Sequence, residues 1–452
     1  MGKARVARLL RQSVQSTFTS PPEIAIVGAG PSGFYAAEAL LKLGINVALI
    51  ERLPAPFGLV RYGVAPDHQK LKTTVAAYER IAQSSRLHFF GNVQVGRDVS
   101  VDNLRKMFHA VIFAHGAHGD RTLGISGEDL GGCHGASAFV GWYNGHPDCR
   151  DHAFDLSQPA AVILGNGNVA LDIARILAKP VEALVASDIA DHALQALAAS
   201  NIRDIHIVGR RGPSQAKFSA NELRELAQIE DCSIHFDARD LAEANPPNST
   251  VAWLSSLAHS AVDSHRRRIH FHFFKRPVRV EGTQRMSSMV LEKTLACEAD
   301  PSRVTGTGEE CQIPAGLLFK AVGYRGHAIL GLPFDHERGV VPTLQDRVLG
   351  DEGQAIPRLY ATGWVKRGPS GVIGTNRADS VAVTRRVVED LAAEHLGDVG
   401  GVQALRVHLC GQTTIDFKDW LQIDQAEIAA GLIASKPREK FTRVQELLAA
   451  AQ

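Results

Sequence analysis

Near the N-terminus, four apolar residues lead directly into a glycine-rich turn, and a helix-forming segment follows. The run Ile24 to Val27 predicts a buried parallel strand, and the segment from Pro31 to about Leu43 predicts a helix. In such a unit Gly28 permits the tight turn, Gly30 lets the backbone approach a pyrophosphate, and Gly33 lets the helix pack closely on the strand. The helix N-terminus offers free N–H groups and a partial positive charge to the phosphates.

The next apolar strand, Val47 to Ile50, ends at an acidic residue, Glu51. This carboxylate stands roughly 20 residues after the glycines, where it would hold a ribose hydroxyl of an adenosine. Strand, glycines, helix, strand and acid in this order predict a dinucleotide site, with Ala29 in the middle of its turn. The alternative is a structural βαβ unit with no ligand.

A second strand–turn–helix pattern begins at Ala161, with the turn G-N-G-N-V-A starting at Gly165. Its second strand, Ile205 to Val208, is followed by two arginines, Arg210 and Arg211, rather than by an acid. Paired guanidinium groups attract a 2′-phosphate and bind its oxygens through several N–H groups, whereas an acid would repel it. The pattern therefore predicts NADP rather than NAD; the alternative is a pair of surface arginines with no phosphate.

A third Gly-rich stretch, from Leu359 to Gly374, predicts a short strand, a turn and a long helix to about His395. The dipole at the start of that helix would stabilise negative charge, such as a reduced flavin acquires. Two dinucleotide units in one chain suggest two nucleotides, one bound as a flavin and one as an exchanging nicotinamide.

The composition excludes several other classes of protein. A net charge of +1 over 452 residues gives no general attraction to nucleic acid. No apolar run approaches the roughly 18 residues of a membrane span. The six cysteines are scattered without a C-x-x-C pair. Neither a zinc site nor a thiol redox pair is therefore indicated, and we expect no metal in this chain.

The first twenty residues differ from the rest, because they are basic and rich in Ser and Thr, with no acidic residue before Glu23. This composition is typical of a mitochondrial transit peptide. The alternative is an ordinary basic terminus of a bacterial cytoplasmic protein.

A basic segment with interleaved aromatic residues runs from His265 to Arg279. The aromatics alternate as in a strand, which favours a place in the core, and the charges favour a solvated face. The alternative is a docking patch for an acidic protein, formed by Arg266, Arg267, Arg268, Lys275, Arg276 and Arg279.

Several longer motifs are specific enough to indicate a family. The chain resembles adrenodoxin reductase-type ferredoxin–NADP⁺ reductases, flavoproteins of glutathione-reductase-like architecture, over essentially everything after about residue 22. The matching motifs are G-A-G-P-S-G-F-Y-A-A from Gly28, P-F-G-L-V-R-Y-G-V-A-P-D-H from Pro56, G-N-G-N-V-A-L-D from Gly165, G-R-R-G-P from Gly209, N-E-L-R-E-L from Asn221, G-W-V-K-R-G-P-S-G-V-I-G-T-N from Gly363 and K-P-R-E-K from Lys436.

The resemblance implies sites for FAD and NADPH. It places FAD around Ala29, Glu51, Leu59, Val95, Trp364, Gly371, Val372 and Ile373. It places NADPH against Asn166, Gly167, Asn168, Val169, Arg210, Arg211 and Glu222, with Gly371 near the nicotinamide. His68 matches a family histidine near the flavin and the nicotinamide. We expect His68 and Glu222, the candidate catalytic residues, to position the nicotinamide, because hydride transfer to a flavin needs no general base.

The predicted fold is α/β, with two Rossmann-like three-layer nucleotide-binding domains. The FAD domain is expected at residues 21–115 and 333–452, the NADP domain is inserted at 116–332, and residues 1–20 form the leader. The implied reaction moves a hydride from NADPH to FAD and then single electrons to an acidic 2Fe-2S ferredoxin. The iron must belong to the partner, because no iron-ligating cysteine pattern occurs in this chain.

Other functions stay open at this point. A flavin-dependent NADPH oxidase or monooxygenase would pass the electrons to oxygen, and a non-catalytic flavoprotein would bind the cofactors only to scaffold partners. We expect a monomer in the mitochondrial matrix, with the bacterial cytoplasm as the alternative location.

Overall fold

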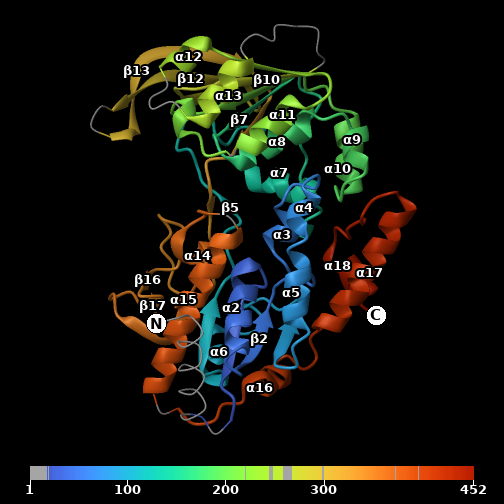
Figure 1. Cartoon of the computed structure of the whole chain (residues 1–452), viewed down its shortest axis with the longest axis vertical. Coiled ribbons are helices and arrows are strands. Elements are labelled where there is room, and N and C mark those ends of the chain that lie inside the picture. The colour runs from blue at the N-terminus through green and yellow to red at the C-terminus, as the bar shows by residue number, and fades with distance from the viewer. Residues whose placement is uncertain are drawn as a thin grey trace.

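The computed structural model describes residues 18, 20–218, 220–243, 248–257, 267–297, 300–371, 373–394 and 396–452. Within them the chain forms two α/β bodies, one above the other in Figure 1. We call the part built on the sheet that contains the N-terminal strand the first body, and the part built on the other large sheet the second body. The expected leader falls almost entirely outside the described residues.

The sheet of the first body has the strand order β16-β17-β18-β4-β1-β2-β3. Five strands run parallel, and β16 and β17 add an antiparallel hairpin at one edge. Central strands covered on both faces are continuously apolar, as the sequence of β1 predicts. The strands are β1 (Glu23–Val27), β2 (Asn46–Ile50), β3 (Leu87–Phe90), β4 (Ala110–Phe113), β16 (Thr343–Leu344), β17 (Arg347–Leu349) and β18 (Ala355–Ala361).

Helices cover both faces of this sheet. The long helix α15 packs along α2 on one face, and α6 and α16 lie on the other. The C-terminal helices α17 and α18, red in Figure 1, stand at the side of the first body. The bounds are α2 (Pro31–Leu41), α3 (Leu59–Tyr62), α4 (Gln69–Lys72), α5 (Val75–Ala82), α6 (Val101–Met107), α14 (Trp364–Arg367), α15 (Ile373–Ala393), α16 (Gly401–His408), α17 (Phe417–Ile433) and α18 (Val444–Ala450).

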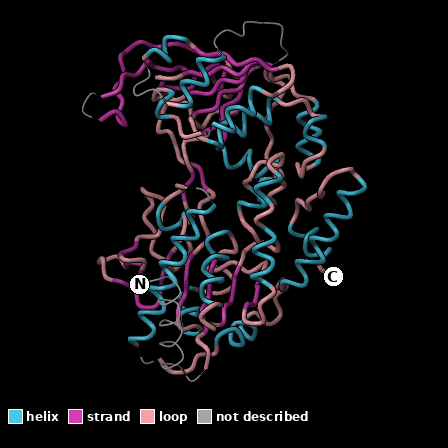
Figure 2. Tube along the Cα trace, in the orientation of Figure 1, coloured by secondary structure: helices cyan, strands magenta, loops and turns pink. Residues whose placement is uncertain are grey.

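The second body has a parallel sheet of order β6-β14-β7-β8-β10-β9. Helices cover one face, and the antiparallel meander β11-β12-β13 covers part of the other (Figure 2). The strands are β6 (Cys133–Gly135), β7 (Ala160–Leu164), β8 (Asp204–Val208), β9 (Cys232–Phe236), β10 (Arg267–His272), β11 (Lys275–Gly282), β12 (Met286–Cys297), β13 (Asp300–Pro314) and β14 (Leu317–Lys320). The helices are α7 (Ala136–Tyr143), α8 (Asn168–Ala178), α9 (Glu182–Val185), α10 (Asp191–Ala198), α11 (Ala220–Ala227), α12 (Ala238–Ala242) and α13 (Ser249–Leu257).

The chain passes between the bodies twice, at a small antiparallel pair. This pair consists of β5 (Gly119–Asp120) on the way out and β15 (Tyr324–Arg325) on the way back. The second body is therefore inserted between β4 and β16 of the first. The predicted α/β fold, with one nucleotide-binding unit inserted in the other, is confirmed.

In two places the structure is less regular than the local sequence predicts. The sequence from Gln69 to Ala82 predicts one helix, but the structure divides it into α4 and α5 at Thr73 and Thr74. The Thr73 hydroxyl donates a hydrogen bond to the Lys70 carbonyl oxygen at 2.8 Å, and such a local bond competes with the helical ladder. The sequence from Val93 to Val95 predicts a short strand, but the structure has only an isolated bridge between Val95 and Val99, because Gly96, at φ +93°, turns the chain.

The basic segment is not a free docking patch. Its apolar positions Ile269 and Phe271 are buried in the core, as predicted. Four of its cations, however, bond to groups within the second body, whereas Lys275 has no ion pair among the described residues. Arg267 is itself buried and donates to the Leu177 carbonyl oxygen. Of the others, Arg268 pairs with Asp204, Arg276 with Glu292, and Arg279 with Glu281 and Glu310, while Arg266 lies outside the described residues.

Four histidines gather on one side of the second sheet. His206, His270 and His235 are in register on β8, β10 and β9, and their ring centroids are 4.6 and 5.0 Å apart. The His206 Nδ1 and His272 Nε2 atoms are 3.0 Å apart. Burial lowers the pKa of His206 to about 3 and that of His272 to about 4. The side chains of His206 and His272 are therefore neutral at pH 7.

Acid should destabilise the second body through these histidines. Between pH 6.5 and about 4 the unfolded chain takes up protons that the folded histidines do not, so the free energy of unfolding falls as the pH falls. Replacing His272 with Gln should make the fall less steep, by at most about 1.4 kcal/mol per pH unit. The measurement is the midpoint of thermal unfolding from pH 7 to pH 4.5, with His336→Gln as the exposed control. A His272→Gln profile that runs parallel to the unsubstituted protein would contradict this account.

Candidate functional site

The first glycine turn contains glycines of two kinds: two that the fold requires and one that leaves room for a ligand. Gly28 has φ +109°, and a Cβ there would lie 2.6 Å from the His115 Cα. A Cβ on Gly33 would lie 2.0 Å from the Gly28 carbonyl oxygen, so helix and strand touch at this point. A Cβ on Gly30, in contrast, would have no protein atom nearer than 4.0 Å. The open space at Gly30 fits a pyrophosphate at the start of α2.

Glu51 lies at this turn, as its spacing predicts. Its Oε2 atom accepts the N–H of Ala29 at 2.9 Å, and its Oε1 atom accepts the N–H of Leu53 at 3.2 Å. Burial raises the pKa of Glu51, against the lowering effect of the Ala29 hydrogen bond. The carboxylate is thus held beside the turn by backbone groups, in reach of a ribose.

The loop after Glu51 returns to the same turn. Phe57 donates its N–H to the Ala29 carbonyl oxygen at 2.8 Å, and a Cβ on Gly58 would lie 3.1 Å from the Gly30 Cα. Leu59 follows immediately as the first residue of α3. Val95 belongs to the apolar cluster on the face of the first sheet that α6 and α16 cover, and Val93 donates its N–H to the Glu51 carbonyl oxygen at 2.9 Å, just after β2. The structure therefore brings Leu59 to the first turn and Val95 to the neighbouring strand ends.

The third Gly-rich stretch also meets the first turn. The N–H of Gly363 donates to Asp379 at 2.6 Å, and the hydroxyl of Ser380 donates to the Ser32 carbonyl oxygen at 2.9 Å. A Cβ on Gly363 would lie 2.1 Å from the Ser32 Oγ. Trp364 therefore begins α14 close to the start of α2.

The remaining residues expected around the flavin lie at the start of α15. Gly371 has φ +82°, and a Cβ there would lie 2.7 Å from the Thr375 Oγ1. Ile373 is the first residue of α15, and Val372 lies outside the described residues.

The second turn repeats the design of the first. A Cβ on Gly165 would lie 2.3 Å from the Ala321 carbonyl oxygen, but a Cβ on Gly167 would meet nothing within 4 Å. Asn168 and Val169 then open α8. The side chain of Asn166 packs against Gly209, and its Oδ1 atom is buried and accepts no hydrogen bond from the described residues. An open cradle and an unsatisfied amide oxygen fit a nucleotide at this turn.

Arg210 and Arg211 are fixed through their backbone, while their guanidinium groups are left available for a ligand. Their backbone carbonyl oxygens accept hydrogen bonds from the Thr294 hydroxyl at 2.7 Å and the Phe274 N–H at 3.3 Å. Within the described part of the chain, neither guanidinium group makes an ion pair or a hydrogen bond. This contrasts with Arg268 and most other arginines of the second body, and it fits a site for a phosphate dianion.

Lys217 is a further candidate for this site that the sequence did not reveal. Its N–H donates to the Asn166 carbonyl oxygen at 2.7 Å, which fixes its backbone against the second turn, and its side chain is exposed. Lys217 stands several residues after the arginine pair and belongs to no recognisable motif, so the sequence alone did not indicate it.

His68 is held by the second body. Its Nε2 atom lies 2.7 Å from Glu225 Oε2, and its Nδ1 atom lies 3.9 Å from Asp172 Oδ1. Glu225 stands on α11, one turn after the expected Glu222. The motif N-E-L-R-E-L contains both acids, so the partner of His68 could not be chosen without the fold.

Next to His68, an ion pair joins the two bodies. Arg175 of α8 is fully buried and donates from Nε and Nη2 to the two carboxylate oxygens of Asp67, at 2.8 and 3.0 Å. It also bonds Asp172 at 2.6 Å, and Lys179 lies 2.6 Å from Asp67. Despite the opposing effect of burial, these cations lower the pKa of Asp67. The segment that carries His68 is therefore fixed between the bodies.

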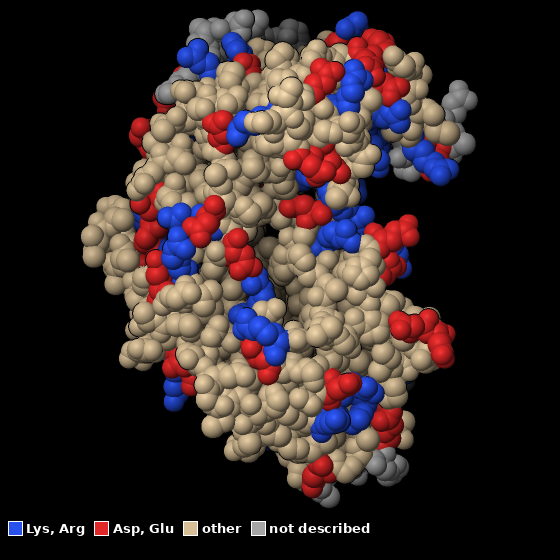
Figure 3. All heavy atoms as spheres, turned by 180° about the vertical axis from the view of Figure 1, so that it is seen from behind, with Lys and Arg blue, Asp and Glu red and all other residues tan. Residues whose placement is uncertain are grey.

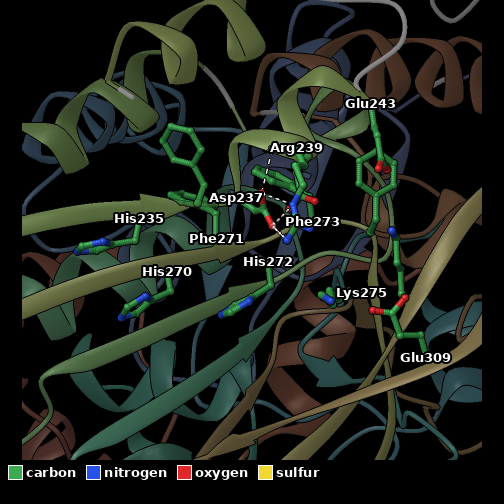
Figure 4. Close-up of a pocket in the computed structure, with 14 residues that line it drawn as sticks. His235, Asp237, Arg239, Glu243, His270, Phe271, His272, Phe273, Lys275 and Glu309 are labelled. Carbon is green, nitrogen blue, oxygen red and sulfur yellow. Dashed lines mark hydrogen bonds and ion pairs between the residues drawn. The ribbon is translucent and has the colours of Figure 1, made fainter. Parts of the chain in front are cut away.

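A separate pocket of about 320 Å³ lies on the second body, and Figure 4 shows it. Histidines of β9 and β10 line one side, and Asp237, Arg239 and Glu243 at α12 line another. The lining of this pocket includes neither His68 nor its partners Glu225 and Asp172. Among the described residues, no cluster of His, Cys, Asp and Glu has the arrangement of a metal site. None of the described helices could cross a membrane.

Comparison with known proteins shows the family. Residues 22–207 match the pyridine nucleotide-disulphide oxidoreductase family. The chain is 40% identical to the mitochondrial NADPH:adrenodoxin oxidoreductase of Arabidopsis thaliana, over 98% of this chain and 99% of that protein. It is also 40% identical to the NADPH-ferredoxin reductase FprA of Mycobacterium leprae, over 94% of this chain and 97% of that protein. The chain belongs to the adrenodoxin reductase-type family of NADPH-dependent reductases.

A solved structure agrees with this assignment. The structure of Mycobacterium tuberculosis FprA in complex with NADPH matches with a TM-score of 0.90 and 39% identity, over 96% of this chain and 100% of that one. The resemblance expected from the motifs is therefore confirmed for this reductase. Its relatives include both mitochondrial and bacterial proteins.

Gly30 offers a direct test of the first nucleotide site. Replacing Gly30 with Val should give a folded protein without flavin colour, because the new side chain would fill the space for the pyrophosphate and meet no protein atom at its Cβ. The measurement is the flavin absorbance per protein after purification. Gly397→Val, which also adds its Cβ in open space, should keep full absorbance. A full flavin spectrum in Gly30→Val would mean that the site is misplaced.

Proposed function

We propose that this reductase is an FAD-dependent NADPH:ferredoxin oxidoreductase. The observation that carries the proposal is the pair of guanidinium groups of Arg210 and Arg211, which have no partner among the described residues and stand beside an open glycine turn, in a chain whose other glycine turn holds a buried acid. The first arrangement suits a 2′-phosphorylated nucleotide and the second suits the ribose of FAD. The related reductases, about 40% identical over nearly the full chain, support the same function.

Each body would hold one nucleotide. The FAD site would comprise Gly28, Ala29, Gly30, Gly33, Glu51, Leu59, Val95, Trp364, Gly371, Val372 and Ile373. The NADPH site would comprise Asn166, Gly167, Asn168, Val169, Arg210, Arg211 and Glu222. When bound, FAD supplies the chemistry that couples a two-electron hydride donor to a one-electron acceptor. On this assignment residues 21–115 and 333–452 form the FAD domain, and residues 116–332 form the NADP domain.

The residues between the bodies would orient the nicotinamide. Glu225 holds the His68 ring at Nε2, and Asp172 faces its other nitrogen. Transfer of a hydride requires no proton to be removed from the donor, so these groups act by positioning. Figure 3 shows a hollow between the two bodies with side chains of both charges around it. Such a surface is an entrance that a charged coenzyme can use.

The electron acceptor would be an acidic 2Fe-2S ferredoxin. The alternative acceptor is oxygen, as in an NADPH oxidase or monooxygenase. The deciding experiment is NADPH-driven cytochrome c reduction by the purified holoenzyme, with and without a ferredoxin from the same source. Reduction that requires the ferredoxin supports the proposal. Equal NADPH consumption in its absence, with oxygen consumed, would support the oxidase instead.

The coenzyme preference should depend on the arginine pair. Replacing Arg210 and Arg211 together with Ala should weaken NADPH strongly and NADH little, with a loss of discrimination of about 3–5 kcal/mol, because two charge-assisted contacts disappear. The measurement is kcat/KM for each coenzyme with ferricyanide as acceptor. Arg239→Ala, which removes an exposed arginine of the same body already paired with Asp237, should leave the ratio unchanged. Equal losses with both coenzymes would rule out a phosphate site here.

The leader composition favours import into the mitochondrial matrix over a bacterial cytoplasmic location. A fusion of residues 1–22 to a fluorescent reporter should enter mitochondria in the native eukaryotic cell. The same fusion with the four cations of the leader replaced by Gln is the control and should stay in the cytosol. A diffuse signal from the unsubstituted fusion would exclude import.

A further inference from the structure

The C-terminal segment 436–443, which we call the C-terminal strap, lies between the two bodies. It connects α17 to α18, and in Figure 1 these red helices stand beside α3–α5 and below α10. Three residues of the strap besides Lys440 bond to the second body. Lys436 Nζ donates to the Ile189 carbonyl oxygen at 3.1 Å, Glu439 accepts the Asp191 N–H at 3.1 Å, and Arg443 pairs with Asp151 at 2.7 Å.

Lys440 is the innermost cation of the strap. The three nearest acceptors of its ammonium group come from both bodies: Asp188 Oδ2 at 2.9 Å, the Asn144 carbonyl oxygen at 3.1 Å and the Arg61 carbonyl oxygen at 3.3 Å. The Asn144 Oδ1 atom lies slightly farther away, at 3.5 Å. An ammonium group has three N–H donors, so its hydrogen-bonding capacity matches its surroundings. Asn144 and Asp188 belong to the second body and Arg61 to the first.

Two side chains of the first body also bond to Asp188. Lys72 Nζ lies 2.6 and 2.7 Å from its two oxygens, and Gln69 Nε2 donates to it at 2.9 Å. Both residues stand on α4, directly after His68. One buried carboxylate thus joins the second body, the strap and the helix next to the candidate nicotinamide-positioning residue.

This arrangement is costly for stability. Lys440 and Asp188 are 4% and 3% exposed. Burial, with the nearby charges of Lys72 and Arg61, lowers the pKa of Lys440 to about 7, although Asp188 opposes the shift. Apolar side chains often stabilise a protein at least as well as buried ion pairs do. A buried cation bonded to three separate segments is therefore better explained by the geometry that it imposes.

We propose that Lys440 is a positioning residue that fixes the second body against the first. The inference rests on the proposed function, because hydride transfer needs the reacting atoms of two bound nucleotides about 3–3.5 Å apart. The bonds of Lys440 to Asp188 and to the backbone carbonyl groups of Asn144 and Arg61 hold that separation. None of these four residues is a proposed nucleotide-binding residue.

The experiment measures the separation of the bodies directly. Cys311 on β13 and Cys410 after α16 are exposed, one on each body. Spin labels on both, with the four partly buried cysteines replaced by Ala, report the distance between the bodies by double electron–electron resonance on the holoenzyme. Replacing Lys440 with Met should broaden or shift this distribution. Asp188 keeps Lys72 in that variant, so no buried charge is left unpaired.

A kinetic readout accompanies the distance. In anaerobic stopped-flow reduction of the bound flavin, Lys440→Met should lower the limiting rate at saturating NADPH about tenfold or more. The apparent dissociation constant of NADPH should change less than about twofold, because no proposed nucleotide contact is lost. Lys440→Arg, which keeps the charge, should recover part of both effects. Arg438→Met removes a cation of the same strap whose ion pairs stay with Asp424 and Glu427 of α17, and should alter neither readout.

An unchanged distance distribution and an unchanged limiting rate in Lys440→Met would overturn the proposal, as would equal changes in Arg438→Met. If Lys440→Met does not fold, Lys440→Gln, which keeps one donor group without the charge, takes its place under the same criteria. Flavin that NADPH fails to reduce in the unsubstituted protein would refute the proposed function instead. In that case the distance measurement would still decide whether Lys440 holds the bodies together.

Discussion

The ion pair between Asp67 and Arg175 is the contact on which the working arrangement depends. In the proposed function each body holds one nucleotide, and the two nucleotides can react only if the bodies keep a fixed separation. Arg175 is fully buried on α8, the helix that follows the second glycine turn, and it binds Asp67 through two nitrogen atoms. Removing one partner of such a buried pair leaves an uncompensated charge, which typically costs about 3–5 kcal/mol. His68 follows Asp67, so this ion pair also places the candidate positioning residue.

The glycines of the two turns divide into two kinds. At Gly28, Gly33 and Gly165 a Cβ would clash with the protein backbone, so the fold itself requires glycine. At Gly30 and Gly167 a Cβ would meet no protein atom closer than about 4 Å. Open space at a conformationally ordinary glycine that stands in a strand-to-helix turn, next to the free N–H groups of the helix, fits a phosphate that approaches the backbone there. The same division occurs in both bodies, which supports two nucleotide sites of one design.

The charged groups were harder to assign from the sequence. For the basic segment around β10 the sequence favoured a solvated charged face and left a docking patch as the alternative, but Arg267 is buried and Arg268, Arg276 and Arg279 have acidic partners. Arg210 and Arg211 have none among the described residues. Which cations are neutralised depends on acids that the fold brings in from other strands. Likewise Glu222 and Glu225 lie one helical turn apart, and only the position of α4 decides that Glu225 meets His68.

The sequence by itself determined the two strand–turn–helix units, the acid after the first and the arginines after the second. These features depend on local spacing, because a glycine turn, its helix and the next strand are close along the chain and the strand ends then meet at one edge of the sheet. The tertiary structure alone decided how the bodies are joined. Asp67 and Arg175 are separated by 108 residues, and Lys440 and Arg61 by 379. No pattern of hydrophobicity or spacing encodes such a pair, since its energy arises only when folding buries both groups and excludes water from between them.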